Sequence, residues 1–188
     1  MNLLKSIRYR IGNYYFKKEI VNLKRKKVTV TIDKAKYIGI LYAVEGEKQY
    51  QIVCDFVKSL QDERKEIKAI GFIDNKAIPY FCYPKLAYDY FTKKDLNWFM
   101  KPSNKFVNDF INIEYDLLID LSTESCFPLQ YIGGISKAKF KVGRYGINPL
   151  NFYDLMFQVD SKIKLEDYIK HIRHYLSILI TQNNAGKT

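Results

Sequence analysis

The chain has 188 residues, of which 47% are hydrophobic and 27% charged, so it suits one ordinary folded domain and is not intrinsically disordered. Its formal net charge is +11, and residues 1–36 hold eleven Lys and Arg against two acids, whereas the rest of the chain is nearly neutral. Lys5, Arg8 and Arg10 interrupt the start, and no run of about 20 apolar residues occurs. We therefore expect a cytoplasmic protein with no transmembrane segment.

The N-terminal segment predicts a basic amphipathic helix. Between residues 3 and 21, apolar side chains recur at close to helical spacing, and most of the basic ones fall between them. Gly12 predicts a break near the middle of this helix. The basic run 24–27 follows, and then Val28, Val30 and Ile32 alternate with threonines, which predicts a half-buried strand.

From residue 37 on, short apolar runs alternate with helical stretches, which is typical of a parallel sheet covered by helices on both faces. The expected strands are residues 37–43, 67–73, 88–92, 116–121, 139–143 and 154–159. The expected helices are residues 49–64, a helix capped by Ser103, and residues 128–135 and 165–179. This order predicts a Rossmann-like three-layer α/β domain with a mostly parallel sheet. It would span residues 37–182, between a basic N-terminal helix and arm (residues 1–36) and a disordered tail (residues 183–188).

The cysteines and histidines predict neither a disulfide framework nor a metal site. Cys54, Cys82 and Cys126 are odd in number and widely spaced, so we expect reduced thiols in the core. His171 and His174 lie on the last predicted helix, where they flank its apolar stripe. One glycine between two acids follows the first strand, unlike the glycine-rich loop of a dinucleotide site. We therefore expect no metal and no cofactor.

Polar side chains follow several predicted strands at their carboxyl ends, where ligands bind in open α/β sheets. They are Glu45, Asp74, Asp120, Ser122 and Glu124. Such acids are suited to acid–base chemistry, but Asp and Ser are also ordinary helix caps, and both interpretations stay open. Both histidines lie on one helix, so no Ser-His-Asp or Cys-His set can be assembled, and we assign no catalytic residue.

The basic start predicts binding to a polyanion, because Lys and Arg greatly outnumber acids there and tyrosines are interleaved among them. Three alternatives stay open: RNA held by phosphate contacts and aromatic stacking, an anionic membrane surface, or a helix that packs on its own domain and exposes its charges. The candidate nucleic-acid-binding residues are Arg8, Arg10, Lys17, Lys18, Lys24, Arg25, Lys26 and Lys27, extended by Lys139, Lys141 and Arg144.

Several segments resemble those of an uncharacterised single-domain protein family of the Bacteroidota, which implies a cytoplasmic bacterial protein and brings no activity with it. They are KYIGIL (36–41), KAIGF (68–72), FTKKDLNW (91–98), DLLIDL (116–121), SKAKFKVG (136–143) and YDLM (153–156). Residues 115–143 are also similar to part of the N-terminal half of heptosyltransferase-type glycosyltransferases, which bind the nucleotide-sugar in a second domain that this chain lacks.

These observations predict a non-enzymatic protein that associates with RNA or a ribonucleoprotein, such as the ribosome, through its basic N-terminal arm. The alternative is a membrane-peripheral or degenerate glycosyltransferase-like protein that acts in the crevice after Leu121.

Overall fold

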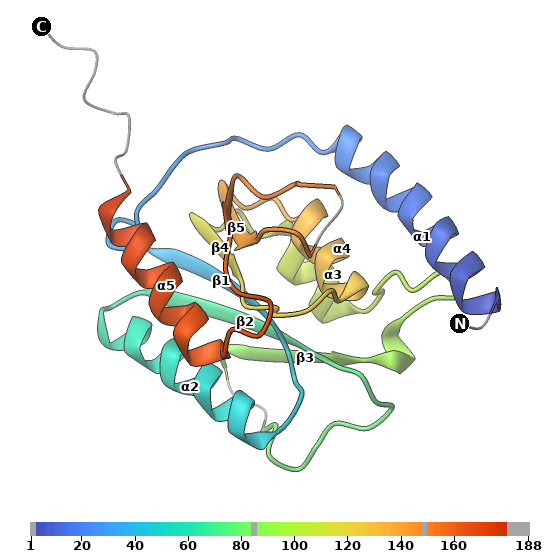
Figure 1. Ribbon diagram of the computed structural model, residues 1–188, viewed down its shortest axis with the longest axis horizontal. Coiled ribbons are helices and arrows are strands. Elements are labelled where there is room, and N and C mark those ends of the chain that lie inside the picture. The colour runs from blue at the N-terminus through green and yellow to red at the C-terminus, as the bar shows by residue number, and fades with distance from the viewer. Residues whose placement is uncertain (1–2, 84–85, 148–149, 180–188) are drawn as a thin grey trace, which may run out of the picture.

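A computed structural model describes residues 3–83, 86–147 and 150–179 of the chain, so the tail predicted at 183–188 lies outside the described residues. Six parallel strands form one sheet in the order β3-β2-β1-β4-β5-β6, and the predicted Rossmann-like α/β fold is confirmed (Figure 1). The strands are β1 (Tyr37–Ala43), β2 (Glu66–Ile73), β3 (Tyr88–Thr92), β4 (Leu117–Asp120), β5 (Phe140–Arg144) and β6 (Leu155–Phe157).

Helices cover both faces of this sheet (Figure 1). On one face lie α2 (Glu47–Asp62) and α5 (Leu165–Ile178), and on the other α3 (Lys105–Asn112) and α4 (Phe127–Ile135). A 3-10 turn, η1 (Lys93–Asp95), follows β3. The N-terminal helix α1 (Leu3–Asn22) packs against α4, on the side of α4 that faces away from the sheet (Figure 1). No helix in the described part of the chain is long and apolar enough to cross a bilayer.

The central strands are buried on both faces, as their continuous apolar runs predict. In β1, Ile40 faces the core beneath α2 and α5, whereas Leu41 faces the core beneath α3 and α4. Gly39, two residues before Leu41 on the same face of β1, leaves room for neighbouring side chains, because a Cβ there would lie 2.9 Å from both Leu118 Cδ1 and Tyr115 Cδ2. Burial of this apolar surface is the main term that stabilises the domain.

The strand predicted at residues 28–32 is wrong. Burial alternates only as far as Val30, since Thr31 and Ile32 are both buried, and the backbone bonds of the segment reach two different elements instead of one neighbouring strand. The Val28 N–H donates to Lys139 O at 3.1 Å, and the Ile32 N–H donates to Leu176 O at 3.2 Å. Alternation of apolar and polar residues indicates a half-buried segment, but it does not show that a neighbouring strand is there to pair with it.

Two predicted helix details also differ. Helix α1 runs unbroken through Gly12, so the predicted break is wrong. A Cβ at that position would overlap Phe99 O and lie 3.0 Å from the Phe127 ring, so the packing requires a glycine there. Gly12 therefore permits a close approach of helix and domain rather than a break. Helix α3 is capped by Asn104 instead of Ser103, and the Asn104 Oδ1 accepts a hydrogen bond from the Val107 N–H at 2.8 Å.

Candidate functional sites

The inward face of α1 is packed on the domain, as one of the three open alternatives predicts. Phe16 is 1% exposed and stacks on Tyr131 of α4, with ring centroids 4.8 Å apart. Tyr9 and Phe16 both contact the Phe127 ring edge to face. Glycine at position 134 lets Phe16 approach the backbone of α4. The helix is thus held by an aromatic cluster, and its orientation on the domain is fixed.

Polar contacts fasten the same side of α1. The Glu19 carboxylate accepts hydrogen bonds from the Tyr131 hydroxyl at 2.6 Å and from Lys101 Nζ at 2.7 Å. Near the other end of the helix, Arg8 Nε donates to Trp98 O at 2.5 Å. Glu19 is the sole acid in the sequence of α1, so these contacts leave the opposite side of the helix without negative charge.

The side of α1 that points away from the domain, its outward face, is both apolar and basic. Four exposed apolar side chains follow one another along it at helical spacing, and three exposed basic side chains lie beside them. The apolar residues are Leu3, Ile7, Tyr14 and Val21, which are 76%, 41%, 65% and 83% exposed, and the basic residues are Arg10, Lys17 and Lys18. Exposed apolar side chains that gather on one surface and are bordered by polar residues are typical of an interaction site.

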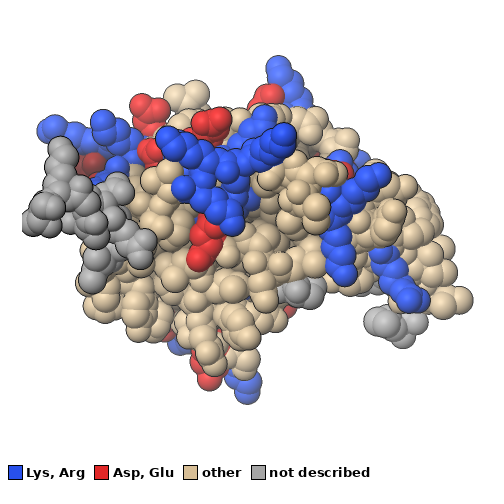
Figure 2. Space-filling view, turned by 90° about the horizontal axis from the view of Figure 1, so that it is seen from above, with Lys and Arg blue, Asp and Glu red and all other residues tan. Residues whose placement is uncertain are grey.

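The segment after α1 exposes three of its four basic side chains. Lys24, Lys26 and Lys27 face solvent, and Figure 2 shows basic side chains gathered on this side of the molecule. Arg25 does not belong to this surface. Its side chain is 5% exposed and pairs with Asp154 at 2.6 Å, while it also donates to the carbonyls of Ala138 and Lys139. Arg25 therefore fastens the segment to the domain.

The predicted extension of the basic surface through β5 is corrected by the structure, because Lys141 and Arg144 are interior groups. Lys141 is 1% exposed, donates to Gly134 O at 2.8 Å, and has its pKa lowered to about 6 by burial. Arg144 is buried and donates to the carbonyls of Thr123 and Asp160. Lys139 is partly exposed, but it is paired with Asp116 at 2.8 Å.

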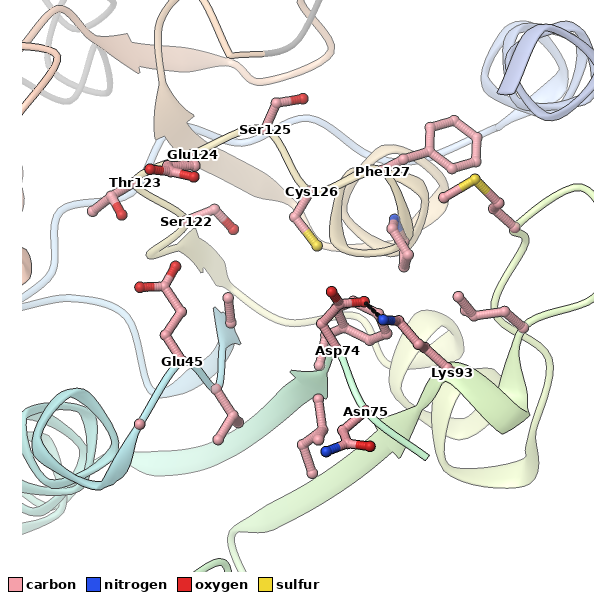
Figure 3. Close-up of a pocket in the computed structure, with 18 of the residues that line it drawn as sticks. Glu45, Asp74, Asn75, Lys93, Ser122, Thr123, Glu124, Ser125, Cys126 and Phe127 are labelled. Atoms are coloured by element: carbon pink, nitrogen blue, oxygen red, sulfur yellow. Dashed lines mark ion pairs between the residues drawn. The ribbon is translucent and has the colours of Figure 1, made fainter. Parts of the chain in front are cut away.

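A crevice of about 1140 Å³ lies at the carboxyl ends of β1, β2 and β4 and continues beside η1. Four of the five predicted crevice residues line it: Glu45, Asp74, Ser122 and Glu124. In Figure 3 they surround one opening, with Glu45 on the β1 side and Glu124 on the β4 side. Strands β1 and β4 are neighbours whose following helices lie on opposite faces of the sheet, which is where open α/β sheets leave a crevice.

The fifth predicted residue, Asp120, is a buried structural group and does not line the crevice. Its carboxylate accepts hydrogen bonds from the Tyr153 hydroxyl and, at 2.9 Å, from the Ser122 N–H. Burial raises the pKa of Asp120, although these hydrogen bonds oppose the shift. Asp120 therefore positions the loop after β4 instead of meeting a ligand.

Sequence reasoning missed the residues that reach the crevice from distant segments. Leu4 and Arg8 come from α1, Lys93 comes from η1, and Met100 comes from the loop after it. Lys93 pairs with Asp74 at 2.9 Å. No local pattern links these positions to strands 1 and 4. Phe127 could have been predicted as a crevice residue, because it is the first residue of α4 and directly follows the loop that holds Ser122 and Glu124.

The cysteines are free thiols, and the two histidines of α5 contact a neighbouring tyrosine. All three cysteines are free, and burial raises the pKa of Cys82 to about 11 and that of Cys126 to about 12. Both imidazoles, of His171 and His174, contact the Tyr175 ring. Within the residues that the structure describes, no three His, Cys, Asp or Glu side chains are grouped so that they could hold a metal ion.

Comparison with known families places the chain but brings no activity. Residues 8–179 match a family described as Family of unknown function (DUF6913). The chain belongs to this family. The match begins within α1 and ends just after α5, so residues 8–22 of the packed N-terminal helix lie within the family's domain. No curated protein shows significant similarity to the chain.

Proposed function

We propose that the protein is a peripheral membrane protein that binds an anionic lipid surface through the outward face of α1. The observation that carries this proposal is the exposed apolar stripe beside Arg10, Lys17 and Lys18, on a helix whose other face is fixed to the domain. Apolar residues lie on both sides of α1, so the helix as a whole has little amphipathic character. Its outward face nevertheless combines the two features by which interfacial helices bind, apolar side chains for the acyl chains and basic ones for the headgroups.

Charge and apolar area act together in such binding. Each Lys or Arg near an anionic leaflet contributes about 1 kcal/mol, and this contribution falls off within a Debye length. Lys24, Lys26 and Lys27 directly follow α1 and face solvent, so they would add to the attraction. The sequence resemblance implies a protein of the bacterial cytoplasm, and such a protein would meet the anionic inner leaflet of the membrane.

RNA is the rival polyanion, and it uses the cations but not the aliphatic side chains. Nucleic-acid bases stack on aromatic rings, and Tyr14 is exposed for such a contact. Leu3, Ile7 and Val21 would stay in water in an RNA complex, whereas a lipid surface would cover them. A second copy of the chain fits less well, because pairing two such faces brings basic residues together without acids.

Vesicle co-sedimentation tests the proposal. The full chain should sediment with phosphatidylglycerol-containing vesicles and stay in solution with phosphatidylcholine vesicles. The double variant Lys17→Glu/Lys18→Glu should lose at least about thirtyfold in partition, since two cations contribute about 2 kcal/mol. Lys58→Glu on α2 is the matched control, because Lys58 is exposed on the face of the sheet away from α1. Equal sedimentation with both vesicle types would contradict the proposal.

A second variant separates lipid from RNA. Ile7→Ser/Val21→Ser removes two exposed aliphatic side chains and no charge, so it should weaken vesicle binding several-fold and leave folding unchanged. Fluorescence anisotropy with a labelled structured RNA provides the comparison. If the protein binds RNA with a steep salt dependence, and the Ile7→Ser/Val21→Ser variant binds it equally well, RNA replaces lipid as the partner.

A further inference from the structure

We propose that the crevice at the carboxyl ends of β1, β2 and β4 binds a small organic cation, an ammonium group carried on an apolar ring or chain. The crevice lies where β1 and β4 send their loops to opposite faces of the sheet, and its volume of about 1140 Å³ admits a molecule of metabolite size. This inference does not depend on membrane binding, since the residues that carry it lie outside the outward face of α1.

One end of the crevice is negatively charged. Glu45 follows β1 and Glu124 follows β4, and in Figure 3 both carboxylates border the same opening. Asp74 is paired with Lys93, so its charge is compensated. Within the described residues neither Glu45 nor Glu124 has an ion-pair partner within 4.0 Å; Glu45 accepts one hydrogen bond, from Gln49. Ionised carboxylates only accept hydrogen bonds, so a bound group here must be a donor.

A buried hydroxyl supports a ligand at this end. Ser122 is 3% exposed, and its Oγ has no partner at hydrogen-bonding geometry, although it lies close enough to Asp120 to lower the pKa of that carboxyl. Figure 3 shows the Ser122 side chain directed toward the crevice between Glu45 and Cys126. Buried polar groups are nearly always paired in folded proteins, so an unpaired hydroxyl at the crevice wall is suited to a ligand N–H.

The other end of the crevice is apolar. Phe127, Met100 and Leu96 line it, together with Leu4 from α1. An aromatic or aliphatic body of a ligand would be removed from water there, while its ammonium group reaches the carboxylates. The thiol of Cys126 lies between the two ends, and its raised pKa keeps it protonated at neutral pH. We therefore infer binding at this site and not covalent chemistry.

A phosphorylated ligand fits this charge pattern less well. The loop after β1 holds Glu45, Gly46 and Glu47, so a diphosphate placed at the N-terminus of α2 would meet two acids and a single glycine. The same argument weighs against the nucleotide-sugar of a glycosyltransferase-like enzyme. Arg8 lies at the α1 side of the crevice and is the one cation there besides the paired Lys93 among the described lining residues.

Ligand-observed NMR tests this inference with three probes that share a phenyl ring. They are 2-phenylethylamine, 2-phenylethanol and 3-phenylpropionate, and AMP serves as the phosphate probe. We expect the amine to bind most tightly, and Glu45→Gln/Glu124→Gln to weaken it roughly tenfold. Glu166→Gln is the matched control, because Glu166 is an exposed acid on α5, and it should leave binding unchanged.

The ranking of the probes on the unmodified protein keeps the inference falsifiable even if the double variant is unstable. Preference for 3-phenylpropionate or AMP over the amine would overturn it, as would equal binding of all three phenyl probes. Amine binding that survives Glu45→Gln/Glu124→Gln in a protein with an unchanged melting temperature would also overturn it. Vesicle binding should be the same for this variant and the unmodified protein, so the two proposals fail independently.

Discussion

Phe16 of α1 packs directly on Gly134 of α4, where a Cβ would lie 2.5 Å from Phe16 Cζ. This close approach lets Phe16 stack on Tyr131 and brings Gly12 against Phe127. The contact also decides which side of α1 faces solvent. The exposed apolar stripe therefore follows from a glycine on a different helix, more than 110 residues away in the sequence.

Gly134→Ala should destabilise the protein. An added methyl group has no room beside Phe16, and overpacking of this kind costs about 1–3 kcal/mol, against a gain of about 1 kcal/mol in helix propensity. Urea unfolding should show this loss of stability. Relative to the unmodified protein, amide hydrogen exchange should accelerate more in α1 than in β1. Gly46→Ala is the control, because a Cβ there meets nothing within 4 Å and the backbone is extended. A Gly134→Ala protein as stable as the unmodified one would contradict this packing.

Asp116 should stabilise the folded state through the start of β1. Its carboxylate accepts hydrogen bonds from the N–H groups of Lys36 and Tyr37, at 3.0 and 3.1 Å, and from Lys139 Nζ at 2.8 Å. Partial burial acts to raise the pKa of Asp116, but the bonds from Lys139 and the two amides outweigh it and lower the pKa. Asp116→Ala should cost about 1.5–3 kcal/mol, as loss of charge-assisted hydrogen bonds does.

The lowered pKa fixes the sign of the pH dependence. Above the unfolded pKa of about 3.9 the folded state holds the ionised form more strongly, so the stabilisation is fully present there. It is lost as the pH falls through the lower folded pKa, and Asp116→Asn should flatten this acid limb in urea unfolding. Asp109→Asn, an exposed acid on α3, should leave the limb unchanged. An acid limb equally steep in Asp116→Asn would count against this account.

Cys82 and Cys126 should react slowly with thiol reagents in the folded protein. Burial raises the pKa values of their thiols to about 11 and about 12, so the thiolate fraction at pH 7.5 falls at least about a hundredfold below that of a free cysteine. Alkylation followed by peptide mass spectrometry measures each position separately. The same reaction in guanidinium is the control and should be fast at every cysteine. Rapid native labelling of Cys126 would show that the thiol is a reactive group.

The sequence predicts the sheet well because the central strands β1 and β4 are continuous apolar runs buried on both faces, and the other strands keep most of their apolar residues together. The expected strands match the observed ones within two residues, including Tyr88–Thr92, which matches at both ends. The segment 28–32 is the exception, because its alternation reflects contacts with Lys139 and Leu176 that no local pattern specifies. Four of five crevice residues were also predictable, since parallel strands end at one edge.

Charge could be counted from the sequence, but its placement could not. Arg25 stands in a run of four basic residues, three of which face solvent, and it is buried because Asp154 lies 129 positions further on. Lys141 alternates with apolar residues in a strand, and only the tertiary structure shows that it ends on Gly134 O. Basic runs therefore indicate a surface, and burial decides which members belong to it.

Lys141 should limit stability at neutral pH. Burial lowers its pKa to about 6 in the folded state, whereas an unfolded Lys titrates near 10.4. Between these values the unfolded chain binds a proton that the folded chain does not, so stability should rise with pH by up to about 1.4 kcal/mol per unit. The penalty is complete below about pH 6. Lys141→Met replaces the ammonium group with an unbranched apolar side chain one atom shorter, so it should raise the urea midpoint at pH 7 and remove this slope. Lys170→Met, on the exposed side of α5, is the control and should change neither the urea midpoint nor the pH slope. A destabilised Lys141→Met protein would show that the hydrogen bond to Gly134 O outweighs the cost of burying the lysine.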